Sequence, residues 1–208
     1  ERRSQDPSLA QAVRSHPDWA TADPALRAAL AFHVTTEIEQ EFAADWTDLS
    51  SWWFDAGEAF PGGDARPEPG YDRLLAPLAA GLDLRLGARV TALTATPGGV
   101  EAQIDGGGRI AGRAAVVTLP LGVLKAGDVA FAPALAPARR RAIDRLGMGL
   151  LTKLALRFER PFWARGADWL GLPGTAHPSW VATGDTLLAL QAGAAAQTAE
   201  ALDDRART

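Results

Sequence analysis

The first part of the chain carries apolar side chains at the spacing of an α-helix. Four of them recur at every fourth position: Leu26, Leu30, Val34 and Ile38. Asp23 followed by Pro24 is typical of an N-cap and a first helical residue, because the aspartate oxygen accepts from free backbone N–H groups and proline has no N–H of its own. The pattern therefore predicts helical structure over residues 7–46.

A segment rich in glycine and proline, residues 60–70, marks a boundary after these helices. Residues 71–80 then favour a short helix with Leu74, Leu75 and Leu78 on one face, ended by Gly81.

Alternating patterns follow the short helix and predict strands. The strands are expected at residues 82–86, 90–96, 100–104 and 114–119, the last as a buried apolar strand. Glycine-rich turns at residues 97–99 and 106–108 separate them and indicate a small antiparallel meander. The triple glycine lacks the strand-loop-helix context of a phosphate-binding loop, so we interpret it as a hairpin turn.

The last third of the chain mixes both patterns. A helix is predicted over residues 137–146, closed by Gly147, and strands over residues 150–158 and 187–191. Residues 192–202 favour a final helix.

Composition and charge narrow the possible functions. The 208 residues are 47% apolar and 22% charged, as in an ordinary globular protein. The net charge of −4 argues against a nucleic-acid partner, which needs a clustered basic surface. No apolar window reaches the roughly 18 residues of a membrane span. The chain has no cysteine, and its three histidines have no metal-ligand spacing. We therefore expect a cytoplasmic protein that binds no membrane and no metal.

Three stretches in a fixed order resemble the flavin-containing amine oxidase family, which includes monoamine and polyamine oxidases and lysine-specific histone demethylases. They are residues 70–79 with 86–90, residues 116–125, and residues 148–158 with Pro161-Phe162-Trp163; residues 187–193 add a weaker fourth. The resemblance covers about the last two-thirds of the chain.

The resemblance implies a two-domain flavoprotein fold of the α+β or α/β class, of which this chain holds part. Residues 1–64 would form the helical part of the substrate domain, and residues 65–128 a central segment of the FAD-binding domain. Residues 129–208 would return to the substrate domain and its mixed sheet.

The resemblance also implies roles for six residues. Val90 would offer its backbone to the adenine end of FAD, and Thr118, Leu119 and Pro120 would end a strand beside the cofactor. Lys153 would be the catalytic residue and hold a water against the flavin N5. Trp180 would approach the flavin ring.

The strand that contains Lys153 allows two interpretations of this residue, one inward-pointing and one facing solvent. A lysine that points inward from an apolar strand is desolvated and becomes a positioned hydrogen-bond partner. In the sequence Leu-Thr-Lys-Leu-Ala-Leu, however, Lys153 alternates with Leu154, and alternation is also typical of the solvent-facing position of a half-buried strand. Both interpretations remain open at this point.

The sequence departs from the family pattern in ways that bear on the cofactor. It contains no Gly-x-Gly-x-x-Gly fingerprint between a strand and a helix, the element that binds the FAD pyrophosphate, and it lacks the family's C-terminal flavin segment. It starts with Glu1. We expect a fragment, a truncated gene or one chain of a split enzyme, which a second chain or missing segments would complete. Alone, the polypeptide should bind FAD poorly or not at all.

The leading hypothesis is thus part of an FAD-dependent amine oxidase. The intact enzyme would transfer hydride from a small-molecule amine to the flavin, giving an imine, and molecular oxygen would reoxidise the flavin to give peroxide. The alternative is a non-catalytic remnant or scaffold module with the substrate-domain fold. A flavoprotein desaturase shares the fold but matches the stretches around Lys125 and Lys153 less well.

Overall fold

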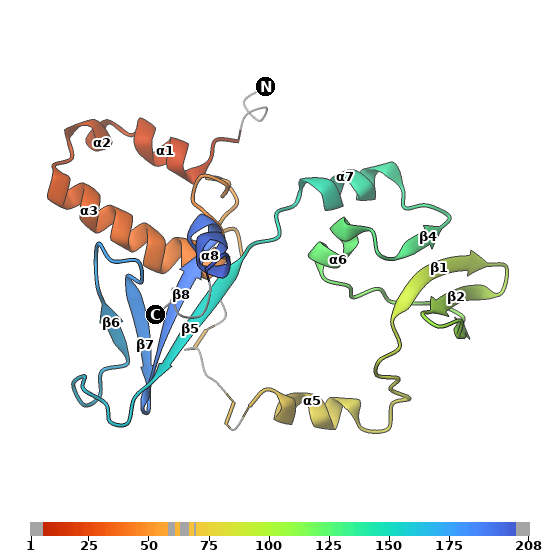
Figure 1. The fold of residues 1–208 in the computed structure, drawn as a ribbon. Helices are drawn as coiled ribbons and strands as arrows, with labels where there is room; N and C mark the ends of the chain where they lie inside the picture. Colours follow the sequence, from red (N-terminus) through yellow and green to blue (C-terminus); the bar gives the residue numbers. More distant parts are fainter. Residues whose placement is uncertain (1–5, 58–60, 63–66, 69, 203–208) are drawn as a thin grey trace. The chain divides into compact units, whose positions relative to one another are not determined.

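The computed structural model describes residues 6–57, 61–62, 67–68 and 70–202. The chain divides into two compact units, each with its own four-stranded sheet. Unit 1 combines Glu1–Glu58 with Gly149–Thr208, and unit 2 is Ala59–Met148 (Figure 1). Within the described residues, the helices are too short or too polar to cross a membrane.

The sheet of unit 1 has the strand order β5-β8-β7-β6. Its strands are β5 (Leu151–Arg157), β6 (Trp169–Gly171), β7 (Ser179–Thr183) and β8 (Thr186–Ala192). The alternating pattern of β5 and the apolar run of β8 predicted these two strands, whereas β6 and β7 were not foreseen. All three pairings are antiparallel, so the expected mixed sheet of this unit is wrong. Short connections such as the turn before Thr186 allow only antiparallel neighbours, because a parallel pair needs a long crossover.

The helices of unit 1 come mainly from the start of the chain, as predicted, but in several pieces. They are α1 (Leu9–Ser15), α2 (Pro17–Thr21), α3 (Pro24–His33), the π-helix η1 (Val34–Glu39) and α4 (Gln40–Phe42), with α8 (Gly193–Glu200) following β8. Asp23 caps α3 as predicted: its Oδ1 accepts from the Leu26 N–H at 2.8 Å. The π-helix was not foreseen, because it shares the apolar spacing of the α-helix that it continues.

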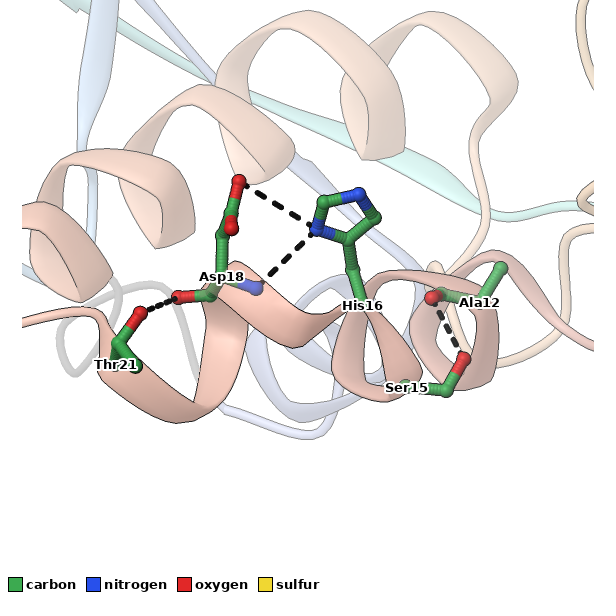
Figure 2. A network of polar contacts seen from close by, with 5 residues as sticks. All are labelled: Ala12, Ser15, His16, Asp18 and Thr21. Carbon is green, nitrogen blue, oxygen red and sulfur yellow. Dashed lines mark hydrogen bonds and ion pairs between the residues drawn. The ribbon is translucent and has the colours of Figure 1, made fainter.

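A local polar network joins α1 to α2. Figure 2 shows His16 between the two helices, where its Nδ1 accepts from the Asp18 N–H at 3.3 Å and lies 3.7 Å from the Asp18 carboxylate. The hydroxyl groups of Ser15 and Thr21 donate to carbonyls three residues earlier. These contacts complete helix ends, and His16 therefore has a capping role. No group of three or more metal-ligating side chains occurs within the described ranges.

The core of unit 1 lies on one face of its sheet. Trp180, Leu187 and Ala189 are buried there, and the partly buried side chains around them come from β5, β6, β7 and the loop after β5: Leu154, Leu156, Phe158, Trp163, Leu170 and Ala182. The other face receives the first helices, because Phe32 of α3 packs edge-on against Trp169 of β6, with ring centroids 5.9 Å apart.

Unit 2 contains a meander whose first two strands were predicted, whereas its third strand lies at residues 109–112 and not at the predicted residues 114–119. Its sheet has the order β3-β2-β1-β4, with β1 (Val90–Thr96), β2 (Gly99–Ile104), β3 (Arg109–Gly112) and β4 (Ala130–Ala132). Strands β1 to β3 are antiparallel, and β4 pairs in parallel with β1. The helices are α5 (Asp72–Ala79), α6 (Leu121–Ala126) and α7 (Pro137–Arg145); α5 and α7 were predicted, α6 and β4 were not.

Two predicted strands of unit 2 are wrong. Residues 82–86 form turns and irregular backbone, and residues 114–119 form no strand. Their apolar side chains are also largely exposed: Leu86 is 91% and Val116 is 89% accessible. Apolar alternation indicates a face that can be buried, but a strand also needs a neighbouring strand for its backbone hydrogen bonds. These two segments have none within the described part of the chain.

Residues 129–148 lie in unit 2, where β4 pairs with β1 and α7 packs with α6. The expected assignment of residues 129–208 to a substrate domain stays a prediction. The chain returns to unit 1 at Gly149.

Candidate functional site

Lys153 lies on β5, at one edge of the sheet in unit 1. Its side chain is exposed, whereas Thr152 and Leu154 on either side are half-buried. The expectation that Lys153 points inward and is desolvated is therefore wrong for this structure, and the solvent-facing interpretation describes its position. The reason is that the packed core occupies the other face of the sheet, next to Leu154. Among the described residues, no side chain forms an ion pair with the Lys153 ammonium group. Its role beside a flavin stays a prediction.

Trp180 occupies the opposite face from Lys153. It pairs with Ala189 of β8, while Lys153 pairs with the next residue, Leu190, and successive side chains of a strand alternate between faces. Trp180 is only 9% exposed, and its Nε1 donates to the His177 carbonyl at 3.1 Å. The structure thus separates the two residues expected to approach the same flavin ring, and it gives Trp180 a packing role.

A cavity of about 810 Å³ lies in unit 1 between α3, η1, the loop 173–178 and the end of β8. We call it the α3–β8 cavity. Most of its wall consists of small apolar residues and Phe32. The charged residues that line it are Glu39 and Asp45, both acidic. The cavity therefore combines an apolar wall with a negative charge.

Local structure fixes both carboxylates in the wall. Glu39 accepts from the Thr35 hydroxyl and from the Trp46 N–H, each at 3.1 Å. Asp45 accepts from the Ala194 N–H near the start of α8, at 3.1 and 3.2 Å to its two oxygens. An ionised carboxylate has about four lone-pair positions, so each retains capacity to accept from a further donor. These contacts orient the two acids without saturating them.

The α3–β8 cavity adjoins the cross-strand pair that Lys153 forms in the sheet. Leu190 lines the cavity and lies directly opposite Lys153 in the β5–β8 ladder. Side chains that are directly opposite in an antiparallel pair have Cβ atoms about 5 Å apart. Lys153 is thus a cross-strand neighbour of a residue that lines the cavity.

The other four residues with an expected cofactor role lie in unit 2. Val90 begins β1 and pairs with Ile104, but the ladder with β4 begins only at Ala92. Thr118 and Pro120 are exposed and Leu119 is half-buried. Instead of ending a strand, these three residues have no regular secondary structure and lead into α6, and the Pro120 carbonyl accepts from the N–H groups of Val123 and Leu124.

Sequence reasoning missed the acidic residues of the cavity. Asp45 had no partner that could be assigned from spacing, and Glu39 stood within an ordinary helical pattern. Their shared wall is formed by the consecutive helices α3 and η1 together with β8, which lies far from both in the sequence. A carboxylate inside an amphipathic helix was the only available signal, and it is a common feature of helix surfaces.

Comparison with known proteins identifies relatives over most of the chain. A family model described as flavin containing amine oxidoreductase matches residues 15–206. Polyamine oxidase 2 of Arabidopsis thaliana is 38% identical over 135 residues, which cover 65% of this chain and 27% of that protein. Probable polyamine oxidase 4 of the same plant is 35% identical over 180 residues, or 81% of this chain and 36% of that protein. This chain therefore spans about a third of the length of these relatives.

Two further comparisons extend the family and support the fold. Lysine-specific histone demethylase 1B of Mus musculus is 34% identical over 151 residues, which cover 68% of this chain and 18% of that protein. A solved structure of wild-type putrescine oxidase bound to putrescine matches with a TM-score of 0.71 and 18% identity, covering 99% of this chain and 49% of that one. The structural match supports a shared fold, and the family match confirms the resemblance seen in the sequence. The chain belongs to the flavin-containing amine oxidoreductase family, where it corresponds to a partial, polyamine oxidase-like region.

Proposed function

We propose that this chain is the amine-binding and lysine-bearing part of an FAD-dependent amine oxidase. The complete enzyme oxidises an amine to an imine, with hydride transfer to the flavin and formation of peroxide from oxygen. The observation that carries the proposal is the α3–β8 cavity, whose charged lining residues are two carboxylates and whose Leu190 faces Lys153 across the β5–β8 pair.

The cavity suits an aliphatic amine for electrostatic and apolar reasons. An alkylammonium group is a strong hydrogen-bond donor, and Glu39 and Asp45 supply carboxyl oxygens as acceptors. The alkyl part of the ligand gains from contact with the apolar wall, at about 25 cal/mol per Å² of area removed from water. An anionic substrate would meet two like charges here.

The residues available for FAD fit the group in part. The exposed Lys153 side chain can donate to a bound water or acceptor, and Val90 has no β4 partner beside it. Exposed apolar residues before Thr118 leave room for a covering group. FAD, when bound, supplies the hydride acceptor. Lys153 would hold a water beside it, Val90 and residues 118–120 would contact it, and the cavity would orient the amine.

The test uses the longer protein that carries these residues. The purified protein should show a flavin absorbance spectrum and form peroxide with aliphatic diamines or polyamines. Lys153→Met should lower kcat by about 100-fold or more, the range of a lost proton-transfer or water-positioning group. Arg157→Met removes a cation from the same face of the same strand, four residues further on, and should leave kcat within two-fold.

The carboxylates are tested by charge removal. Glu39→Gln should raise KM for the amine about ten-fold, which corresponds to about 1.4 kcal/mol of binding, with a smaller change in kcat. A folded long protein without flavin would overturn the proposal and favour a non-catalytic module. Amine turnover that is unaffected by Lys153→Met and Glu39→Gln would overturn the assigned roles.

A further inference from the structure

Two buried polar side chains bond to each other in unit 1. Gln40 is 9% exposed and Ser179 is 2% exposed, and they are the buried polar side chains of the described residues. The Ser179 hydroxyl donates to the Gln40 Oε1 at 2.9 Å, although the two residues lie far apart in the sequence. Buried polar groups are costly unless they are paired, so this contact selects one arrangement of α4 on the sheet.

The bond lies where β7 and β8 separate. The β7–β8 ladder ends at Trp180 and Ala189, so the next pair would be Ser179 and Leu190. Gln40 bridges these two residues: its Nε2 donates to the Leu190 carbonyl at 2.9 Å, and its Oε1 accepts from Ser179. A side-chain amide has the same donor and acceptor groups as a peptide. Gln40 therefore links the Leu190 backbone of β8 to the Ser179 side chain of β7 just beyond the end of the ladder.

The α3–β8 cavity opens at the same place. One wall is the loop 173–178, which leads into Ser179, and another is the end of β8 from Leu190. A second glutamine links these walls, since Gln191 Nε2 donates to the Ala176 carbonyl at 3.0 Å. The Gln40 bridge and the Gln191 contact thus both lie at the border of the cavity, where β7 and β8 separate.

The Gln40 bridge also contacts the strand pair that contains Lys153. Leu190, whose carbonyl Gln40 holds, is the cross-strand partner of Lys153. We propose that Gln40 is a positioning residue that fixes Leu190 and, through the β5–β8 pair, the place of Lys153 relative to the cavity. This proposal depends on the proposed function only for the role that it assigns to Lys153.

The first test needs no flavin. Hydrogen exchange of backbone amides in the 208-residue chain compares wild type, Gln40→Met, Ser179→Ala and the control Gln197→Met. Gln40→Met keeps side-chain length but removes both bonds, and Gln197 is an exposed glutamine on α8. Exchange near Ser179, Leu190 and Lys153 should accelerate about ten-fold or more in Gln40→Met, and less in Ser179→Ala, which keeps the bond to Leu190.

The far end of the same strand pair serves as the internal reference. Amides near Arg157 and Thr186, which pair with each other, should exchange as in wild type, and Gln197→Met should change neither end. Equal exchange near Leu190 in Gln40→Met and wild type would overturn the proposal. If Gln40→Met fails to fold, Ser179→Ala decides: unchanged local exchange in that variant overturns the proposal as well.

The second test uses the longer, flavin-containing protein. Gln40→Met should lower kcat about ten-fold and change the pH dependence of kcat, which a loss of stability alone would not do in a folded sample. An active enzyme in which Gln40→Met leaves both quantities unchanged would overturn the positioning role while the proposed function stands. Local loosening in a protein that proves to have no oxidase activity would support the bridge and contradict only the proposed function.

Discussion

Lys153 and Trp180 project from opposite faces of one four-stranded sheet. Lys153 pairs with Leu190, and Trp180 pairs with Ala189, the adjacent residue of β8. The face with Trp180 holds the packed core of unit 1, and the face with Lys153 adjoins the α3–β8 cavity. A ligand in contact with Lys153 therefore meets Leu190 and not the indole of Trp180.

Replacing Trp180 should affect stability. Truncation of a buried tryptophan costs about 3–5 kcal/mol, so Trp180→Ala should lower the free energy of unfolding of the chain by that order. Trp180→Phe keeps an aromatic ring but loses the bond to the His177 carbonyl, which is worth about 1 kcal/mol. Denaturant unfolding measures both, with Trp53→Ala as the control, since Trp53 is 65% exposed. Equal effects of Trp180→Ala and Trp53→Ala would contradict the packing role.

Substitution of Gly193 tests the contact between the start of α8 and Asp45. Its φ is +54°, and a Cβ there would lie 2.6 Å from Asp45 Oδ1 and 2.8 Å from the Asp45 nitrogen. Gly193→Ala should therefore cost more than the roughly 1 kcal/mol of placing alanine in the left-handed region. Gly184, with a φ of +59° and no atom within 4 Å of such a Cβ, is the matched control. Thermal or denaturant unfolding of Gly193→Ala and Gly184→Ala compares them, and equal losses would contradict the close approach to Asp45.

The turn between β7 and β8 contains a carboxyl group whose pKa is shifted. Arg157 Nε donates to Asp185 Oδ2 at 2.8 Å, and Thr186 donates to Oδ1 at 3.0 Å. The hydrogen bond from Arg157, followed by the one from Thr186, lowers the pKa of Asp185 below its ordinary value of 3.8. Because the folded pKa lies below the unfolded one, the stabilisation is fully present above the unfolded pKa and is lost as the pH falls through the folded pKa.

Arg157→Met should move this pKa back toward its ordinary value. An NMR titration of the Asp185 carboxyl carbon in wild type and variant measures the shift, and added salt should reduce the difference because the pair is exposed to solvent. The Asp83 carboxyl, paired with Arg85 in unit 2, provides an internal reference that Arg157→Met should leave unchanged. Identical titrations of Asp185 in the two proteins would contradict the assigned cause.

The 208-residue chain alone should be colourless and should form no peroxide with amines. Its sequence has no Gly-x-Gly-x-x-Gly between a strand and a helix, and this element supplies the backbone N–H groups that bind the FAD pyrophosphate. Absorbance between about 350 and 500 nm after incubation with FAD and desalting, together with a peroxide-coupled assay, tests this expectation. A yellow preparation that oxidises amines would refute it.

Local sequence was sufficient for elements with strong signals. The alternation from Leu150 to Phe158 predicted β5, the Asp23-Pro24 pair predicted the start of α3, and the turn at Pro97 and Gly98 predicted the hairpin of β1 and β2. In each case the determinant lies within a few residues: an alternating surface, a capping oxygen or a turn residue. The family resemblance also came from short stretches in order, and the family match confirms it.

Elements that depend on partners distant in the sequence could not be predicted from local patterns. The alternation at Leu82 to Leu86 suggested a strand, but no neighbouring strand pairs with it in the described residues, while the short strands β6 and β7 exist because β8 lies beside them. Local sequence also does not determine which face of a sheet is buried. Lys153 and Leu154 lie on opposite faces of any strand, and the buried face is the one that residues from other segments cover.

The sequence by itself determined the family, the main helices and strands, and the residue types available for chemistry, because these depend on side chains that are near one another along the chain. Tertiary structure decided that Lys153 is exposed, that Trp180 packs in the core, that Glu39 and Asp45 line one cavity with the end of β8, and that Gln40 bonds to Leu190 of β8. The physical reason is that side-chain hydrogen bonds and cavity walls join segments that are more than a hundred residues apart, and no local pattern encodes which segments will meet.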